Sequence, residues 1–438
     1  MVTFPTENIK SNFRKNKKVW PALFLIILAG IFLRTYDFRK YLTFSRDQFR
    51  DLKIVQGIVE HNAPWPLLGP NMTGGQGFQL GPAYYWFQII SAKIFGVNRT
   101  HQAYPDVFFS ILSIPLLYYF LRKYFSQTAS LLATAVYAFS YFDIEYSRFA
   151  WNVNLIPFFV LIFLVSFGEF LTENEKTGWR WIVLAGFALG IGVQLHAIIM
   201  LLLPAVVLVG SAILFWTDKK IAWKKMSVIL LIALALNITQ PISELQTKFA
   251  NTKDFQKAFL TQSTETDPVK EFILDVTCNA EANTHAISSL GDEKMCDFLY
   301  ADDSRDSSYS TPLTLDKNPL ELTGEIVSLL FSFLGIGFLI VHFGKETDRR
   351  RKYFLGLIML YSSLYFLIML SVAPGSRMRY YLPIIFLSFV FLAFIFDYLI
   401  RKYPRRYVLA VSVIFLFLIG VNLETIFSRW PHLWQLIR

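Results

Sequence analysis

The chain has 438 residues, a formal net charge of +10, 54% hydrophobic residues and a mean hydropathy of +0.42. A soluble protein of this length would be about 45–50% apolar, whereas the apolar residues here form long runs. The distribution of charge argues against nucleic-acid binding, because basic residues cluster between the runs while residues 244–321 hold 15 acidic and 7 basic residues. The composition therefore predicts a polytopic integral membrane protein.

The long apolar runs predict transmembrane helices. A helix needs roughly 17–25 apolar residues to cross a ~30 Å hydrocarbon core, and helices satisfy their own backbone hydrogen bonds in lipid. The first run follows a basic segment and precedes no small-residue cleavage site, so we expect it to be retained as a span. About eleven spans (roughly 10–13) are expected, at residues 19–36, 105–121, 128–144, 154–171, 180–196, 197–216, 226–243, 323–342, 354–373, 380–400 and 407–423.

The basic clusters between the spans predict the orientation of the chain. If these clusters are cytoplasmic, the N-terminus lies inside and the C-terminus outside. Residues 82–97 are apolar but include Lys93, and a crossing here would place the later basic clusters outside, so we expect an interfacial or re-entrant helix. The fold class is then all-α: one membrane domain over 1–438, a first outer loop at 37–104 with amphipathic helices, and an acidic outer loop or lid at 243–322 before the eighth span.

The first outer loop carries two acids at helical spacing. Residues 47–61 alternate apolar and charged side chains with a helical period, which predicts an amphipathic surface helix. Asp47 and Asp51 are four residues apart and share one face of such a helix. They could bind a divalent cation, or one could act as a base. The alternative is a structural helix in which Arg46 and Arg50 neutralise both acids, and spacing alone favours this alternative.

Three arginines stand at the outer ends of spans, against the charge rule. Arg148 lies between the third and fourth spans, and Arg377 and Arg379 precede the tenth. A planar guanidinium suits phosphate, although interfacial anchoring or contact with lipid headgroups would also explain each residue. His196, at the end of the fifth span, is by itself more typical of a packed side chain. Since the topology places all of them on the side of the two acids, the set suits a phosphorylated lipid substrate.

The two cysteines of the chain, Cys278 and Cys296, both fall in the acidic outer loop. An outer compartment is oxidising, so a disulfide between them is expected. Two free thiols are the alternative. The absence of cysteine from every predicted span and inner loop favours the disulfide.

Short motifs along the chain resemble those of a known family. In order they are an acidic motif at 45–51, GPAYYW at 81–86, SRFAWNVN at 147–154, QLH at 194–196 and RYYLP at 379–383. This order is similar to that of the GT-C membrane glycosyltransferases, in particular the branch that includes protein mannosyltransferases and aminoarabinose transferases. The resemblance covers about residues 20–421.

The resemblance implies a glycosyltransferase of the cell envelope. Such an enzyme moves a hexosyl or pentosyl group from a polyprenyl-phosphate-linked donor to a hydroxyl of a protein, lipid or glycan acceptor. It acts at the outer face of the plasma or inner membrane, and a single displacement would invert the anomeric centre. Asp47 matches the catalytic base of the family, and Gln48 stands where a second acid is frequent. Some relatives use a divalent metal ion, which leaves a site at Asp47 and Asp51 open, and no other cofactor is expected.

Rival functions stay open beside the resemblance. A lipid or glycolipid transporter or flippase would show ionisable residues in mid-span and an internal repeat. Glu169 and Asp397 instead lie near the predicted inner ends of spans, and no repeat is evident. A non-catalytic membrane scaffold is the third interpretation.

The residues that the family pattern implies for the donor or its phosphate are Arg148, Arg377, Arg379, His196, Tyr84 and Asn152.

Overall fold

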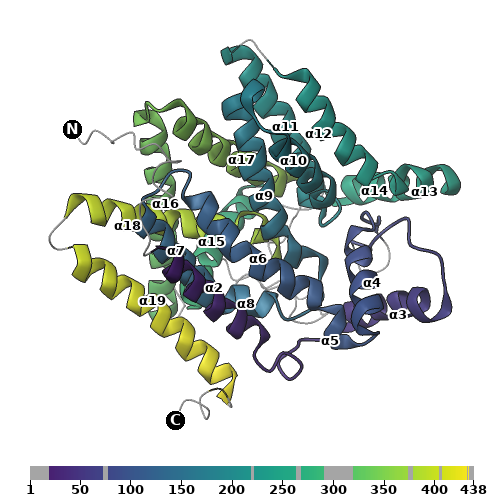
Figure 1. The fold of residues 1–438 in the computed structure, drawn as a ribbon, viewed down its shortest axis with the longest axis horizontal. Helices are drawn as coiled ribbons and strands as arrows, with labels where there is room; N and C mark the ends of the chain where they lie inside the picture. Colours follow the sequence, from purple (N-terminus) through teal and green to yellow (C-terminus); the bar gives the residue numbers. More distant parts are fainter. Residues whose placement is uncertain are drawn as a thin grey trace.

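The computed structural model describes residues 19–72, 77–218, 221–262, 268–290, 319–372, 378–403, 407–431 and 433. Within these ranges the regular structure is helical, apart from an isolated antiparallel bridge between Asn71 and Gln79. The all-α fold class predicted from the sequence is confirmed (Figure 1).

The helices up to the middle of the chain begin with one apolar helix, followed by the three helices of the first loop. Their bounds are α2 (Val19–Thr35), α3 (Arg46–His61), α4 (Ala83–Phe95), α5 (Arg99–Gln102), α6 (Tyr104–Leu121), α7 (Gln127–Phe139), α8 (Tyr141–Tyr146), η1 (Asn152–Leu155), α9 (Ile156–Glu173), η2 (Asn174–Lys176), α10 (Trp179–Gly192) and α11 (Ala197–Asp218).

The helices of the second half include two of the longest in the fold. Their bounds are α12 (Trp223–Leu236), α13 (Thr239–Thr247), α14 (Ala250–Gln262), α15 (Pro268–Ser288), α16 (Pro319–Lys345), α17 (Arg349–Val372), η3 (Met378–Ile384), α18 (Phe386–Lys402) and α19 (Tyr407–Arg429).

Within the described part of the chain, six helical segments are long and apolar enough to cross a membrane: α6, η1 with α9, α11, α16, α17 and α19. A seventh is obtained if α12 and α13, which meet at 51°, form one broken span. The expected span at 128–144 is interrupted at Ser140, whose hydroxyl accepts the N–H of Asp143 and caps α8. Every expected span has a helical counterpart, while the number of eleven crossings stays a prediction.

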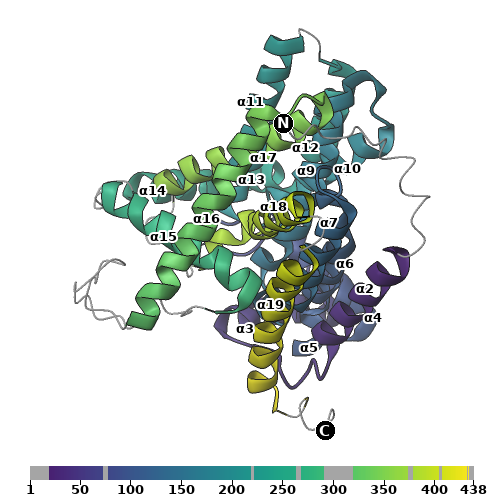
Figure 2. The same cartoon turned by 90° about the vertical axis from the view of Figure 1, so that its left-hand side faces the viewer.

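The helices form one bundle (Figures 1 and 2). One large apolar cluster draws on α6, α7, α9, α11, α17 and α18. Small residues allow the closest helix contacts. A Cβ added at Gly186 would lie 2.9 Å from the carbonyl oxygen of Ile229, and one at Gly190 would lie 3.0 Å from the Cα of Ala233. Because glycine has no Cβ, the backbones of α10 and α12 can approach each other directly.

The first loop forms a small helical layer at one end of the bundle, with α3 and α5 in the lower part of Figure 2. The amphipathic helix expected at 47–61 is α3, whose Val55 and Ile58 pack against Tyr85 and Ile89 of α4. Helix α4 has 13 residues, fewer than a crossing needs, which agrees with an interfacial or re-entrant helix at 82–97. Lys93 lies over the Trp65 ring at 5.0 Å.

The segment expected as an acidic outer loop at 243–322 contains a helix that packs into the bundle. Helix α15 contacts α16, α17, α18 and α19. Its Asn283 donates to Ser332 Oγ at 3.0 Å and accepts from Ser388 Oγ at 2.8 Å, which links three helices. Cys278 on α15 is buried, whereas Cys296 lies outside the described residues, so their pairing stays a prediction.

Candidate active site

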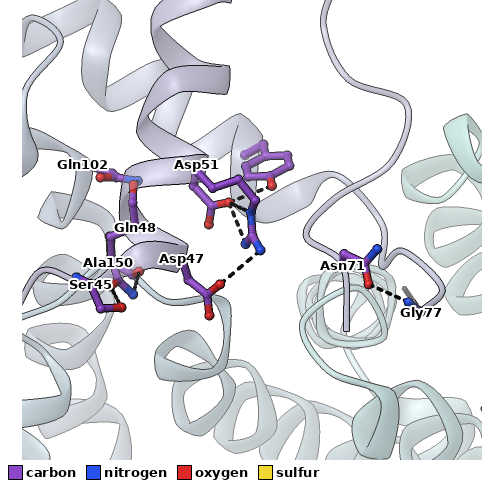
Figure 3. A network of polar contacts seen from close by, with 10 residues as sticks. Ser45, Asp47, Gln48, Asp51, Asn71, Gly77, Gln102 and Ala150 are labelled. Atoms are coloured by element: carbon purple, nitrogen blue, oxygen red, sulfur yellow. Dashed lines mark hydrogen bonds and ion pairs between the residues drawn. The ribbon is translucent and has the colours of Figure 1, made fainter. Parts of the chain in front are cut away.

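The N-terminus of α3 is fixed by the side chain of Gln48. Its Oε1 accepts the backbone N–H of Ser45 at 2.8 Å, and its Nε2 donates to the carbonyl oxygen of Ala150 at 3.0 Å (Figure 3). The Gln102 side chain of α5 donates to the backbone carbonyl of Gln48 at 3.0 Å. Hydrogen bonds from buried amides of this kind hold a helix end in one orientation. The first loop is thereby attached to the 147–154 motif.

Asp47 and Asp51 lie on one face of α3, as their spacing predicts, and Arg50 bridges them (Figure 3). The guanidinium lies 3.1 Å from Asp47 Oδ1 and 2.8 Å from Asp51 Oδ1. The Tyr85 hydroxyl donates to Asp51 Oδ1 at 2.8 Å. The Asp47 side chain is 52% exposed and that of Asp51 is 3% exposed. Asp47 is therefore open to a reactant, whereas Asp51 is enclosed by its partners.

Burial and charge act in opposite directions on Asp51. Burial, the larger effect, raises the pKa of its carboxyl, while the Arg50 guanidinium and the Tyr85 hydroxyl lower it, with a net upward shift. The negative charge of Asp51 adds to burial in raising the pKa of Tyr85, whose phenol therefore stays protonated as a donor. The arrangement suits Asp51 to position Arg50 and Tyr85.

An open pocket of about 360 Å³ adjoins these residues. Arg50 and Tyr85 line it from α3 and α4, Asn71 and Gln79 from the intervening loop, and Ser243 from α13. This volume lies in the range of small-ligand sites, and the lining combines a cation, amides and hydroxyls that can bind a sugar or a phosphate. The pocket therefore connects the predicted catalytic loop to the start of the segment at 243–322.

The metal site predicted at Asp47 and Asp51 has a limited set of donors. The part of the chain that the structure describes holds no group of three or more His, Cys, Asp or Glu side chains suited to a metal ion. Between the two carboxylates lies the Arg50 guanidinium, with which a cation would have to compete. The metal site stays a prediction.

A buried acid that the sequence analysis did not select, Asp106, joins two of the motifs. It is completely buried at the start of α6 and accepts the Tyr84 hydroxyl at 3.1 Å and the backbone N–H of Trp151 at 3.1 Å. An acid at the edge of an apolar run is costly in lipid, so its presence in the sequence indicates a buried polar partner or a functional role. Tyr84 donates to Asp106, and its predicted contact with substrate stays a prediction. Its neighbour Tyr85 lines the pocket.

Arg148 lies in a buried set of contacts, and its expected contact with phosphate stays a prediction. Its side chain is buried and donates to the carbonyl oxygens of Leu33 at 3.0 Å and Tyr36 at 2.6 Å. The guanidinium lies 4.2 Å from the centre of the Trp430 ring. Burial lowers the pKa of Arg148 to about 10, so it stays charged at neutral pH. Arg148 thus connects the end of α2 to the residue after α19.

The remaining motif residues come together on the same side of the bundle. The Asn152 side chain donates to the carbonyl oxygen of Leu195, and the ring of the buried His196 lies 5.6 Å from that of Tyr380. The motifs at 147–154, 194–196 and 379–383 are therefore neighbours. Arg377 and the side chain of Arg379 lie outside what the structure describes, so their predicted contact with phosphate is untested.

Comparison with known sequences supports the resemblance that the motifs indicated. Residues 79–243 match the family described as dolichyl-phosphate-mannose-protein mannosyltransferase. A provisional mannosyltransferase of Bacillus subtilis (strain 168), YycA, is 29% identical over 229 residues, which are 51% of this chain and 32% of that protein. The chain thus spans about a third of the length of this curated relative.

Two solved structures share the arrangement of helices. ArnT from Cupriavidus metallidurans, bound to undecaprenyl phosphate, superposes with a TM-score of 0.53 at 12% identity, over 91% of this chain and 64% of ArnT. The archaeal oligosaccharyltransferase AglB from Archaeoglobus fulgidus, in complex with an inhibitory peptide and a dolichol phosphate, gives 0.55 at 14% identity, over 97% of this chain and 56% of AglB. The chain has the GT-C fold. The similarity to GT-C glycosyltransferases that the motifs predicted is thereby confirmed.

Within the GT-C fold, the candidate site consists of the exposed Asp47, the bridging Arg50 and the adjacent pocket. Asp106 accepts the backbone N–H of Trp151 in the 147–154 motif, and Gln48 attaches the first loop to the same motif. Among the selected residues whose side chains the structure describes, Asp47 and Asp51 contact the pocket-lining Arg50.

Proposed function

We propose that this GT-C protein transfers a sugar from a polyprenyl-phosphate-linked donor to an acceptor hydroxyl at the outer membrane face. The observation that carries the proposal is the exposed Asp47 carboxylate, paired with an arginine that lines a sugar-sized pocket. The family matched by residues 79–243, and the polyprenyl phosphates bound by ArnT and AglB, support the class of donor.

The chemistry requires a base and a place for the departing phosphate. The oxygen of the acceptor hydroxyl forms a bond to the anomeric carbon, and Asp47 accepts the proton of that hydroxyl. The bond between that carbon and the phosphate oxygen breaks, and polyprenyl phosphate leaves as a stable anion. One displacement inverts the anomeric centre. Cationic groups would stabilise the phosphate charge as it develops, and Arg377 and Arg379 are proposed for this role.

Arg50 positions the base in this scheme. Its guanidinium spans the two carboxylates, and the buried Asp51 holds it through an ion pair. Such a bridge fixes the direction of the Asp47 side chain at the edge of the pocket. The predicted location, an integral membrane protein with an outer active site and a cytoplasmic N-terminus, rests on the basic clusters between spans.

The test is a transfer assay in membranes that contain wild-type protein or Asp47→Asn, with radiolabelled undecaprenyl-phosphate mannose as the donor. We expect Asp47→Asn to reduce transfer by about 100-fold or more, because loss of a general base has effects of about that size. Glu60→Gln is the matched control, since it removes an exposed acid from the same helix. Transfer by Asp47→Asn at the wild-type rate would overturn the assignment of the base.

A further inference from the structure

A second cavity lies far from the candidate active site, between α16 and α18. It has a volume of about 890 Å³. The two helices are in contact, and the Phe394 and Asp397 side chains of α18 line the cavity opposite α16. The lining of α16 is an apolar stripe at helical spacing that includes Leu330, Phe333, Leu334 and Val341, and each of these side chains is roughly half exposed. Such a surface fits hydrocarbon chains.

The mouth of this groove is basic. Lys345 ends α16, and Arg401 and Lys402 end α18, and all three line the cavity. Arg401 is paired with Asp397 at 2.7 Å. The Lys402 ammonium donates to the Tyr398 hydroxyl, and neither Lys402 nor Lys345 has a carboxylate partner among the described residues. The mouth therefore carries a net positive charge from these two lysines. This charge is complementary to an anion.

The position of the mouth identifies the leaflet. Helix α18 begins next to η3, which carries Tyr380 beside His196, and its 17 residues extend about 25 Å away from that end. The mouth also lies at two of the basic clusters, residues 345–352 and 401–406, that predict the cytoplasmic side. The groove is thus separate from the candidate active site and opens to the opposite leaflet.

We propose that this groove is a binding site for an anionic phospholipid of the cytoplasmic leaflet. The acyl chains lie along the α16 stripe, and the headgroup phosphate is bound between Lys345 and Lys402. Basic pockets between transmembrane helices on the cytoplasmic side select anionic headgroups by this combination of charge and apolar surface. The occupant is a diacyl phospholipid such as phosphatidylglycerol, and the site needs no sugar donor.

Native mass spectrometry of the purified full chain tests the headgroup part of the proposal. Phosphatidylglycerol and phosphatidylcholine with identical acyl chains are titrated, and the fraction of protein that carries one lipid is measured. We expect the wild type to prefer phosphatidylglycerol. In the double variant Lys345→Gln/Lys402→Gln this preference should fall roughly fivefold for each lysine removed. The matched control Lys176→Gln/Lys224→Gln removes two exposed lysines from other basic segments and should keep the preference. Equal binding of both lipids by the wild type would overturn the proposal.

A steric variant tests the acyl-chain part. Gly337 lines the groove, and a Cβ added there meets nothing within 4 Å, so Gly337→Trp fills the groove without disturbing the helix. Gly420→Trp on α19 is the control, because its Cβ is equally unobstructed outside the groove. Gly337→Trp should reduce phosphatidylglycerol binding several-fold while Gly420→Trp leaves it unchanged. If Gly337→Trp binds the lipid as the wild type does, the groove is not the site.

Discussion

The side-chain amide of Gln48 donates a 3.0 Å hydrogen bond to the carbonyl oxygen of Ala150, across 102 positions in sequence. This contact fixes the helix that carries Asp47 to the loop that carries Arg148 and Asn152. The Gln48 amide has a defined structural role in this contact. Nε2 donates while Oε1 accepts from Ser45, so both ends of the amide are used.

Gln48→Glu should therefore destabilise the protein. The buried carboxylate would face the Ala150 carbonyl oxygen without a proton to donate, which costs about 1–3 kcal/mol. We expect a lower thermal unfolding temperature in detergent. Gln246→Glu, an exposed site on α13, is the control for the same change of charge and should melt as the wild type does. An unchanged melting temperature for Gln48→Glu would show that the Ala150 contact contributes nothing.

Tyr84 and Tyr85 are adjacent but should respond differently to removal of the hydroxyl. Tyr84→Phe leaves the buried Asp106 without one donor and should lower stability by about 1–3 kcal/mol. Tyr85→Phe loosens Asp51 beside the pocket, so it should reduce sugar transfer with a smaller loss of stability. Melting temperature and transfer rate, measured on both variants, distinguish the roles. The reverse pattern would show that the two tyrosines are wrongly assigned.

Arg148→Lys should reduce stability although the charge is conserved. A lysine ammonium cannot reproduce the guanidinium that donates to two carbonyl oxygens and lies against Trp430, and the loss should be about 2 kcal/mol. Trp430→Leu removes the other side of the contact. The unfolding free energies of the two single variants and the double variant form a cycle. Additive effects would show that Arg148 and Trp430 do not interact.

The raised pKa of Asp51 predicts a pH dependence of stability. In the folded state Asp51 keeps its proton at pH values where the unfolded chain, with a pKa near the ordinary value of 3.8, has released it. The folded state then binds more protons, so stability falls as the pH rises from about 3.8 through the folded pKa. Asp51→Asn should remove this part of the decline. Melting curves from about pH 3 to about pH 6 measure the difference between the two proteins, and Glu60→Gln serves as control. Parallel curves for Asp51→Asn and the wild type would contradict the prediction.

Much of the helical framework could be predicted from the sequence. Helix α3 lies where the amphipathic period placed it, and α4 corresponds to the apolar segment that contains Lys93. Both predictions depend on local periodicity. The break at Ser140 and the bend between α12 and α13 were not predicted, because an apolar run does not reveal where a helix changes direction. The buried position of α15 was not expected either, because its polar residues suggested a surface exposed to water. In the fold, Asn283 of α15 forms hydrogen bonds with α16 and α18 instead.

The candidate site divides in the same way. The shared face of Asp47 and Asp51 follows from an interval of four residues, and the order of the motifs along the chain by itself indicated the GT-C fold. These features are encoded locally or by composition, because helix geometry and the length of apolar runs do not depend on the rest of the chain.

Only the tertiary structure decided which polar side chains face the pocket and which support it. The Tyr84 hydroxyl donates to Asp106, and the Tyr85 hydroxyl donates to Asp51. Arg148 donates to carbonyl oxygens of α2 and of the turn that follows it. These outcomes depend on contacts between residues that are 22 to 115 positions apart. A buried polar group must find a hydrogen-bond partner wherever packing supplies one, and sequence spacing does not specify that partner.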